Sequence, residues 1–196
     1  MKSTQRIYEA IATTRRADGG VHAVPLGFRH EGDAVVLSPF RPSTTLDNVL
    51  RDRHAVLNLT DDVRIFAGCL TGRHDWPTEE AREIPGRRLV GALAHLELRL
   101  DRIEDDPVRP RLICLQVHAE THAPFRGFNR AQAAVIEACI LASRLSLISE
   151  EKIRSEIAYL AIAIDKTAGP EEREAWGWVI GRIEDHYRLT APDESK

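Results

Sequence analysis

The 196-residue chain is poor in cysteine and in aromatic residues, and it contains no long apolar run. Its three cysteines, Cys69, Cys114 and Cys139, lie far apart, each among apolar neighbours. A disulfide framework or a structural zinc site needs more cysteines, or closer ones. No segment approaches the roughly 20 apolar residues of a membrane-spanning helix. We therefore expect buried thiols and no membrane partner.

The chain also lacks an excess of either charge. Lys and Arg number 27 against 30 for Asp and Glu, which leaves a net charge of -3. A dedicated nucleic-acid-binding protein usually carries a basic excess, so we expect no nucleic-acid partner. Met1 to Gln5 is polar and no apolar segment follows, unlike a signal peptide. We therefore expect a cytoplasmic protein.

Up to about residue 122, the chain reads mainly as short strands separated by turns. Asp18–Gly20 and Glu31–Asp33 are turn signals between segments of alternating apolar residues. In the clearest strand, residues 95–102, leucines face one way and Glu97 lies on the opposite face with the other polar residues. Several strands joined by short turns predict an antiparallel barrel interrupted by helices.

After Asn129 the apolar residues recur at helical spacing. Asn129 and Ser149 are suitable N-cap residues, and Gly169–Pro170 separates a third helix from the second. We therefore predict a mainly β fold with added α structure, divided into three parts. These are a barrel domain over residues 1–124, a helical subdomain over residues 125–190 and a tail over residues 191–196.

The segment SPFRPSTTLDNVL, residues 38–50, places three hydroxyl side chains before a short amphipathic stretch. If Thr44 is the N-cap, Asp47 lies at the third helical position and can complete a capping box. The same first turn offers unpaired N–H groups to an anion, and Arg41 offers a guanidinium. These residues leave both interpretations open: Ser43–Thr45 is a helix cap or a phosphate site.

No side chain identifies itself as a general acid or base, so the catalytic residues stay unassigned. Cys114, His118 and His122 share one face of a predicted strand. At about 3.3 Å per residue, however, the outer two are roughly 26 Å apart. His118 with Glu120 is a closer pair, but it is more typical of a solvated or interface surface. We therefore expect no metal site.

The order of segments resembles a known fold. A strand, DGGVHAVPLG, a strand, FRPSTTLDNV and AVLNLTDD follow one another as in the FMN-binding split barrels of flavin reductases and pyridoxamine-phosphate oxidases. With FRGFNRAQAAVIEA added, the order resembles more closely an uncharacterised family, DUF447, over about residues 6–190. The resemblance implies an FMN-binding split barrel followed by a helical subdomain. It also implies a homodimer with flavin near the subunit interface.

Site residues follow from the resemblance by position. The phosphate ligands that it implies are Arg41, Ser43, Thr44 and Thr45. It implies that Asn48, one turn into the helix, supports the ribityl chain or phosphate. The strand whose backbone approaches the isoalloxazine would contain Val24, Pro25, Leu26 and Gly27. An edge-strand kink is the alternative for Pro25–Gly27. His22 is a candidate flavin neighbour.

The implied function is a flavoprotein, with the redox chemistry carried by FMN. A flavin-dependent reductase or oxidase of an unknown small substrate fits this picture. The resemblance also suggests a link to tetrahydromethanopterin-dependent one-carbon metabolism. Two alternatives stay open: a non-catalytic binding or assembly protein on the same barrel, and a variant that binds a deazaflavin.

Overall fold

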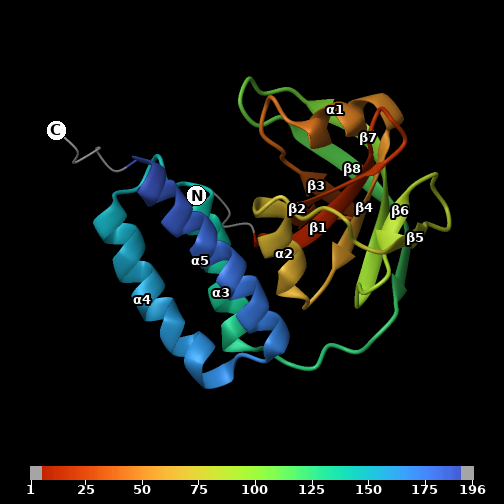
Figure 1. The fold of residues 1–196 in the computed structure, drawn as a ribbon. Coiled ribbons are helices and arrows are strands. Elements are labelled where there is room, and N and C mark those ends of the chain that lie inside the picture. Colours follow the sequence, from red (N-terminus) through yellow and green to blue (C-terminus); the bar gives the residue numbers. More distant parts are fainter. Residues whose placement is uncertain (1–5, 191–196) are drawn as a thin grey trace. The chain divides into compact units, whose positions relative to one another are not determined.

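The computed structural model describes residues 6–190 and divides into two compact units (Figure 1). The first unit contains the residues up to Asp61 and His74–Phe125, and the second contains Asp62–Arg73 and the residues from Arg126 onward. The segment 62–73, expected in the barrel domain, therefore groups with the C-terminal helices. The tail expected at residues 191–196 lies outside the described residues.

The first unit is built on a closed antiparallel barrel, which confirms the predicted fold class. Its six strands close in the order β1-β2-β3-β8-β7-β4. They are β1 (Tyr8–Arg15), β2 (Val21–Glu31), β3 (Ala34–Leu37), β4 (His54–Leu59), β7 (Ala94–Glu104) and β8 (Arg111–Thr121). Helix α1 (Thr44–Asp52) joins β3 to β4, and β5 (Thr78–Glu80) pairs with β6 (Arg87–Leu89) in a separate sheet.

Leucines of facing strands fill the barrel, as the alternation in β7 predicts. Leu57, Leu98 and Leu112 are completely buried. Glu97, on the opposite face of β7, is completely buried as well, because the backbone of residues 82–84 bonds to its carboxylate. One surface of the barrel is therefore covered by a loop that the alternation of β7 does not reveal.

Strand β2 is longer than the strand that pairs with its second edge. β1 pairs with residues 21–28 of β2, whereas β3 pairs only with Phe28–Glu31. Within residues 6–190, β1 is therefore the one strand that pairs with residues 21–27 of β2. No other strand of the barrel covers the second edge of this stretch.

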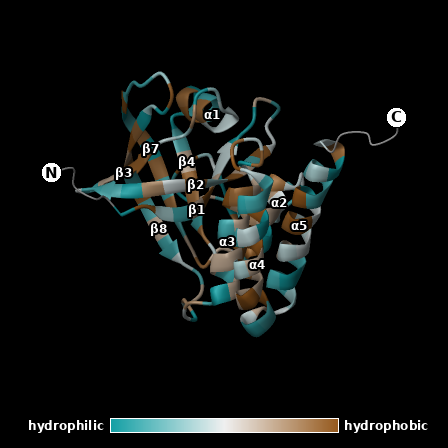
Figure 2. Ribbon diagram, turned by 90° about the vertical axis from the view of Figure 1, so that its left-hand side faces the viewer, coloured by the Kyte–Doolittle hydropathy of each residue, from teal (hydrophilic) through white to brown (hydrophobic). Residues whose placement is uncertain are grey.

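The helices after residue 129 begin where the sequence predicts. The elements of the second unit are α2 (Val63–Leu70), α3 (Arg130–Ala142), α4 (Glu150–Thr167) and α5 (Pro170–Thr190). The side chains of Asp62, Asn129 and Ser149 each accept a hydrogen bond from a first-turn N–H, which confirms the caps predicted at Asn129 and Ser149. Figure 2 shows apolar and polar residues side by side along these helices, as expected for elements with one buried face. No helix within residues 6–190 is both long and apolar enough to span a membrane.

Candidate functional site

Ser43, not Thr44, is the N-cap of α1. Ser43 has an extended backbone, and its Oγ accepts a hydrogen bond from the Leu46 N–H at 3.2 Å. Asp47 therefore lies at the fourth helical position, and its N–H donates to the Ser43 carbonyl. The capping box expected from Thr44 and Asp47 does not form, because the N-cap is Ser43, one residue before Thr44. This leaves the Thr44 hydroxyl free of a capping role.

The other two hydroxyls of the triplet have different surroundings. Thr44 is exposed, whereas Thr45 is buried and its Oγ1 lies 3.1 Å from His22 Nε2 on β2. The backbone N–H groups of Thr44 and Thr45 make no hydrogen bond to any described residue. The start of α1 thus presents unpaired donors next to the one-sided part of β2.

The surroundings of His22 disfavour its charged form. Burial lowers the pKa of the half-buried imidazole, and the nearby Arg16 and His74 lower it further. The neutral form of His22 is therefore favoured at neutral pH. The positive end of the α1 dipole, which lies beside His22, favours an anion.

Asn48 and Arg41 make contacts within the protein. Asn48 is buried; its Nδ2 donates to Thr14 Oγ1 at 3.0 Å, and its Oδ1 accepts from Arg51 Nη1 at 3.1 Å. Arg41 is exposed, and its Nη2 lies 2.9 Å from Asp105 Oδ1 in the turn between β7 and β8. The predicted ligands are thus divided: Thr45 meets β2, Asn48 meets β1 and Arg41 meets Asp105.

The predicted isoalloxazine strand is half-buried and lies on the open stretch of β2. Val24 and Leu26 pack against the barrel core. Pro25 lies opposite Ile11 of β1 and has no N–H of its own to donate. A Cβ at Gly27 would lie 3.0 Å from Ile7 Cγ2, so the glycine already accommodates a neighbour from its own chain. That contact gives Gly27 a structural role whether or not a ligand approaches.

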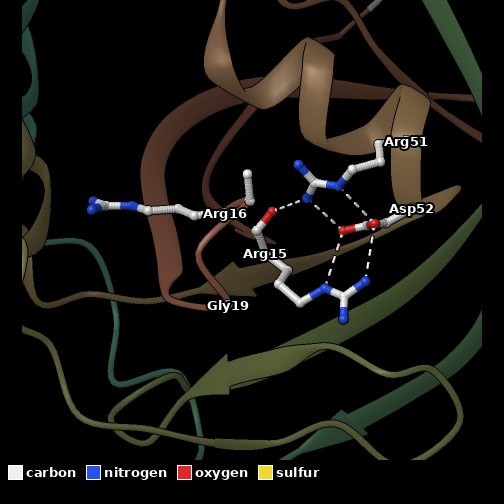
Figure 3. A pocket seen from close by; sticks show the side chains of 6 residues that line it. Arg15, Arg16, Gly19, Arg51 and Asp52 are labelled. Carbon is white, nitrogen blue, oxygen red and sulfur yellow. Dashed lines mark hydrogen bonds and ion pairs between the residues drawn. The ribbon is translucent and has the colours of Figure 1, made fainter.

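A basic pocket lies between the β1–β2 turn and the end of α1 (Figure 3). It has a volume of about 410 Å³ and is lined by Arg15, Arg16, Ala17, Gly19, Arg51 and Asp52. Arg15 and Arg51 converge on Asp52, with N–O distances of 3.1 and 2.7 Å, and hydrogen bonds from both guanidiniums hold the pKa of Asp52 well below its usual range. Arg16 extends away from this cluster. The only sequence signal for the pocket is the pair of arginines at the end of a predicted strand.

A group of histidines surrounds Glu97 on β7 and β8. His95 Nε2 lies 3.1 Å from Glu97 Oε1, and His95 Nδ1 lies 2.9 Å from His122 Nε2. Burial alone raises the pKa of Glu97, but N–H groups of residues 82–84 and the His95 ring outweigh burial and lower it. Spacing along β8 predicted His118 and His122 to be too far from Cys114 to share an ion; it could not reveal His95 on the neighbouring strand.

Comparison with known proteins places both units in one family. The family models for the DUF447 N-terminal domain and for DUF447, both described as proteins of unknown function, match residues 8–123 and 129–181. A search of curated protein sequences found no match. A solved FMN-bound DUF447 protein from Methanosarcina mazei is 23% identical, with a TM-score of 0.79, over 91% of this chain and 95% of that one.

Two further solved structures share the barrel at lower coverage. Nitrilotriacetate monooxygenase component B from Bacillus cereus is 19% identical with a TM-score of 0.52, over 67% of this chain and 78% of that one. The 2-nitrobenzoate 2-nitroreductase from Pseudomonas fluorescens is 19% identical with a TM-score of 0.51, over 62% and 67%. The predicted split-barrel architecture with C-terminal helices is thus confirmed, and the chain belongs to the DUF447 family of proteins of unknown function.

Proposed function

We propose that this chain binds FMN in its barrel unit. The phosphate lies at the first turn of α1, and the isoalloxazine lies along residues 22–27 of β2. The observation that carries this proposal is the contact between Thr45 and His22 at 3.1 Å. It brings the unpaired N–H groups of α1 beside the stretch of β2 that pairs with β1 but not with β3.

The first turn of α1 has the chemistry of a phosphate site. Two unpaired N–H groups, the exposed hydroxyl of Thr44 and the positive end of the helix dipole all favour an anion. Arg41 joins this set if a phosphate replaces Asp105 as its partner. That exchange costs little, because an exposed ion pair contributes only about 0–1 kcal/mol. Asn48 holds α1 against β1 through Thr14 and stays a predicted ligand of the ribityl chain.

The open part of β2 suits a flat ring with polar edges. Along residues 21–27, β2 pairs with β1 but not with β3, and Pro25 has no N–H to donate. Bound FMN supplies the redox chemistry, while these residues bind and orient it. The FMN in the structurally similar Methanosarcina mazei protein of the same family supports this assignment. By the same resemblance, we propose a homodimer with flavin near the interface and a reductase or oxidase activity on a small substrate.

The first experiment tests cofactor identity. Tag-free protein is purified, its visible spectrum is recorded, and the flavin-free protein is titrated with FMN, riboflavin and a deazaflavin. We expect a flavin spectrum, FMN release on denaturation, and tighter binding of FMN than of riboflavin, which lacks the phosphate. Protein that takes up none of the three contradicts the proposal and favours an assembly role. Preference for the deazaflavin supports that alternative instead.

Turnover and assembly need separate measurements. Reduction of the bound FMN by a nicotinamide donor under anaerobic conditions supports an oxidoreductase, whereas bound flavin that no donor reduces indicates a binding protein. Light scattering after gel filtration tests the homodimer. The link to tetrahydromethanopterin metabolism rests on the resemblance alone and stays a prediction.

A further inference from the structure

We propose that the barrel unit binds a divalent transition-metal ion through His95 Nε2, Glu97 Oε1 and His118 Nε2. One ligand atom from each of the three residues lies within 4.8 Å of the other two. Two of the residues come from β7 and one from β8, and the strand register sets Glu97 opposite His118. Two imidazoles and a carboxylate are a ligand set that Zn²⁺ and its first-row neighbours accept, whereas Ca²⁺ and Mg²⁺ prefer oxygen ligands alone.

His118 contributes a buried nitrogen that the protein leaves without a hydrogen bond. Its Nε2 is inaccessible to solvent and makes no hydrogen bond to any described residue; Glu120 Oε2, the other member of its ion pair, is 3.5 Å away. A buried polar atom without a partner costs free energy. An ion held jointly with His95 and Glu97 would give this nitrogen a close partner in addition to the 3.5 Å contact with Glu120.

The other two ligands are already oriented by surrounding groups. Glu97 Oε1 accepts the Arg82 N–H at 2.6 Å, and Oε2 accepts those of Glu83 and Ile84 at 2.7 and 3.1 Å. His95 Nε2 lies 3.1 Å from Glu97 Oε1, a separation that suits two ligands of one ion with bonds of about 2.0–2.2 Å. The ion would replace the proton shared by these two atoms.

His122 fixes the tautomer that ligation requires. If His95 binds the ion through Nε2, its Nδ1 carries the proton and donates it to His122 Nε2, which lies 2.9 Å away. Such outer partners of a metal-bound histidine orient the ring and raise its affinity for the ion. The two rings are also stacked, with an interplanar angle of 9°.

The charge around the cluster fits a dication. Glu97 is completely buried and Glu120 lies beside His118, so two carboxylates face the site. Without an ion, one buried carboxylate is held by three N–H groups and a histidine. With the ion, the backbone of residues 82–84, β7 and β8 would be joined at a single point. We therefore infer that the ion stabilises the covering loop on the barrel.

The test uses tag-free, full-length protein freed of metal with a chelator. Zn²⁺ is titrated in competition with a chromophoric chelator, and Co²⁺ is added separately to record ligand-field bands. The variant is His118→Gln, and the matched control is His74→Gln, an exposed histidine outside the cluster. We expect one tight site in the parent and in His74→Gln, and affinity lower by about 100-fold or more in His118→Gln.

Stability separates a metal ligand from a structural histidine. The polar contact that metal-free His118→Gln loses is the 3.5 Å pair with the exposed Glu120, which contributes only about 0–1 kcal/mol, so the variant should unfold close to the temperature of the metal-free parent. Zn²⁺ should then raise the unfolding temperature of the parent but not of the variant. Equal Zn²⁺ affinity in parent and His118→Gln, or a parent that binds neither Zn²⁺ nor Co²⁺, overturns the proposal.

Discussion

Ser43 and Thr44 are neighbours in the sequence, but the fold uses the hydroxyl of only one of them. Ser43 accepts the Leu46 N–H and so satisfies a donor of the first turn of α1. The Thr44 side chain is exposed. The helix cap and the proposed phosphate site therefore rest on different residues, and the two interpretations of the triplet can be separated by mutation.

Two single variants separate them. Ser43→Ala should lower the free energy of unfolding by about 1 kcal/mol through loss of the cap. Thr44→Ala should leave stability within about 0.5 kcal/mol of the parent, because it removes an exposed side chain. It should weaken FMN binding roughly tenfold or more, since a hydrogen bond to a charged group is worth about 1.5–3 kcal/mol. Urea unfolding of the flavin-free variants measures their stability, and titration with FMN measures their affinity for the cofactor. Thr44→Ala with parental FMN affinity would show that its hydroxyl does not bind the phosphate.

Arg41 is tested through its partner. Asp105→Asn removes the carboxylate that holds Arg41 on the β7–β8 turn. If Arg41 binds the phosphate, Asp105→Asn should tighten FMN binding and Arg41→Ala should weaken it by several-fold. Because the pair is exposed, neither change should alter unfolding by more than about 1 kcal/mol. If both variants bind FMN with the affinity of the parent, Arg41 is not part of the phosphate site.

His54 makes stability depend on pH. It is buried at the start of β4, and this burial lowers its pKa in the folded state, although the nearby Asp52 opposes the effect. The unfolded chain therefore binds a proton more readily than the folded one as the pH falls through about 6.5. This contribution to stability is complete above that pH and is lost below it. We expect urea unfolding at about pH 7.5 and 5.5 to show a smaller loss for His54→Gln than for the parent. An equal loss would assign the pH dependence to other groups.

At the scale of elements, Asn58 connects three strands. Its Nδ2 donates to the Ile11 carbonyl on β1 at 2.9 Å and to Thr13 Oγ1 at 3.1 Å, and its Oδ1 accepts the Leu89 N–H of β6 at 2.7 Å. Asn58 is completely buried. One amide thus attaches β4 to the barrel neighbour β1 and to the separate β5–β6 sheet.

Asn58→Ala should destabilise the protein by about 2–6 kcal/mol. It leaves a buried carbonyl and a buried N–H without partners, and each such group costs about 1–3 kcal/mol. Gln116→Ala is the control, because Gln116 is an exposed residue of β8 and its loss should cost no more than about 0.5 kcal/mol. Urea unfolding of both variants checks the prediction. Similar midpoints for the two variants would mean that Asn58 is not essential to this junction.

Local rules of sequence predict the elements but not the contacts between them. The caps at Asn129 and Ser149 and the leucines of β7 follow from spacing and residue type. The burial of Glu97 does not, because the loop that covers it comes from residues 82–84.

The candidate sites show the same limit. His95 reaches His122 across the register of two strands, and distance along β8 alone says nothing about that register. The hydroxyl triplet was found from the sequence, whereas its contact with His22 depends on how α1 lies against β2. The partner of Arg41 comes from a turn 64 residues away. Site residues were thus predictable as candidates, but their partners were not.

At the scale of the whole molecule, each unit has its own core. The barrel core is built from strand residues and α1, and the second core is built from α2 to α5. The two family models divide the chain between β8 and α3, close to the boundary between the units. Every residue of the proposed FMN and metal sites belongs to the first unit. Ligand binding should therefore affect that unit first.

Amide hydrogen exchange with and without FMN tests this expectation. FMN should slow exchange at residues 21–27 and 43–48, because it occupies the open edge of β2 and the donors of α1. Residues 150–190 of α4 and α5 should exchange at unchanged rates, which makes them an internal control within the same sample. Riboflavin should protect the β2 segment but have less effect on α1, since it lacks the phosphate. Protection of α4 or α5 at saturating FMN would show that the helical unit takes part in binding. Protection of neither segment 21–27 nor 43–48, with FMN demonstrably bound, would place the flavin elsewhere on the chain.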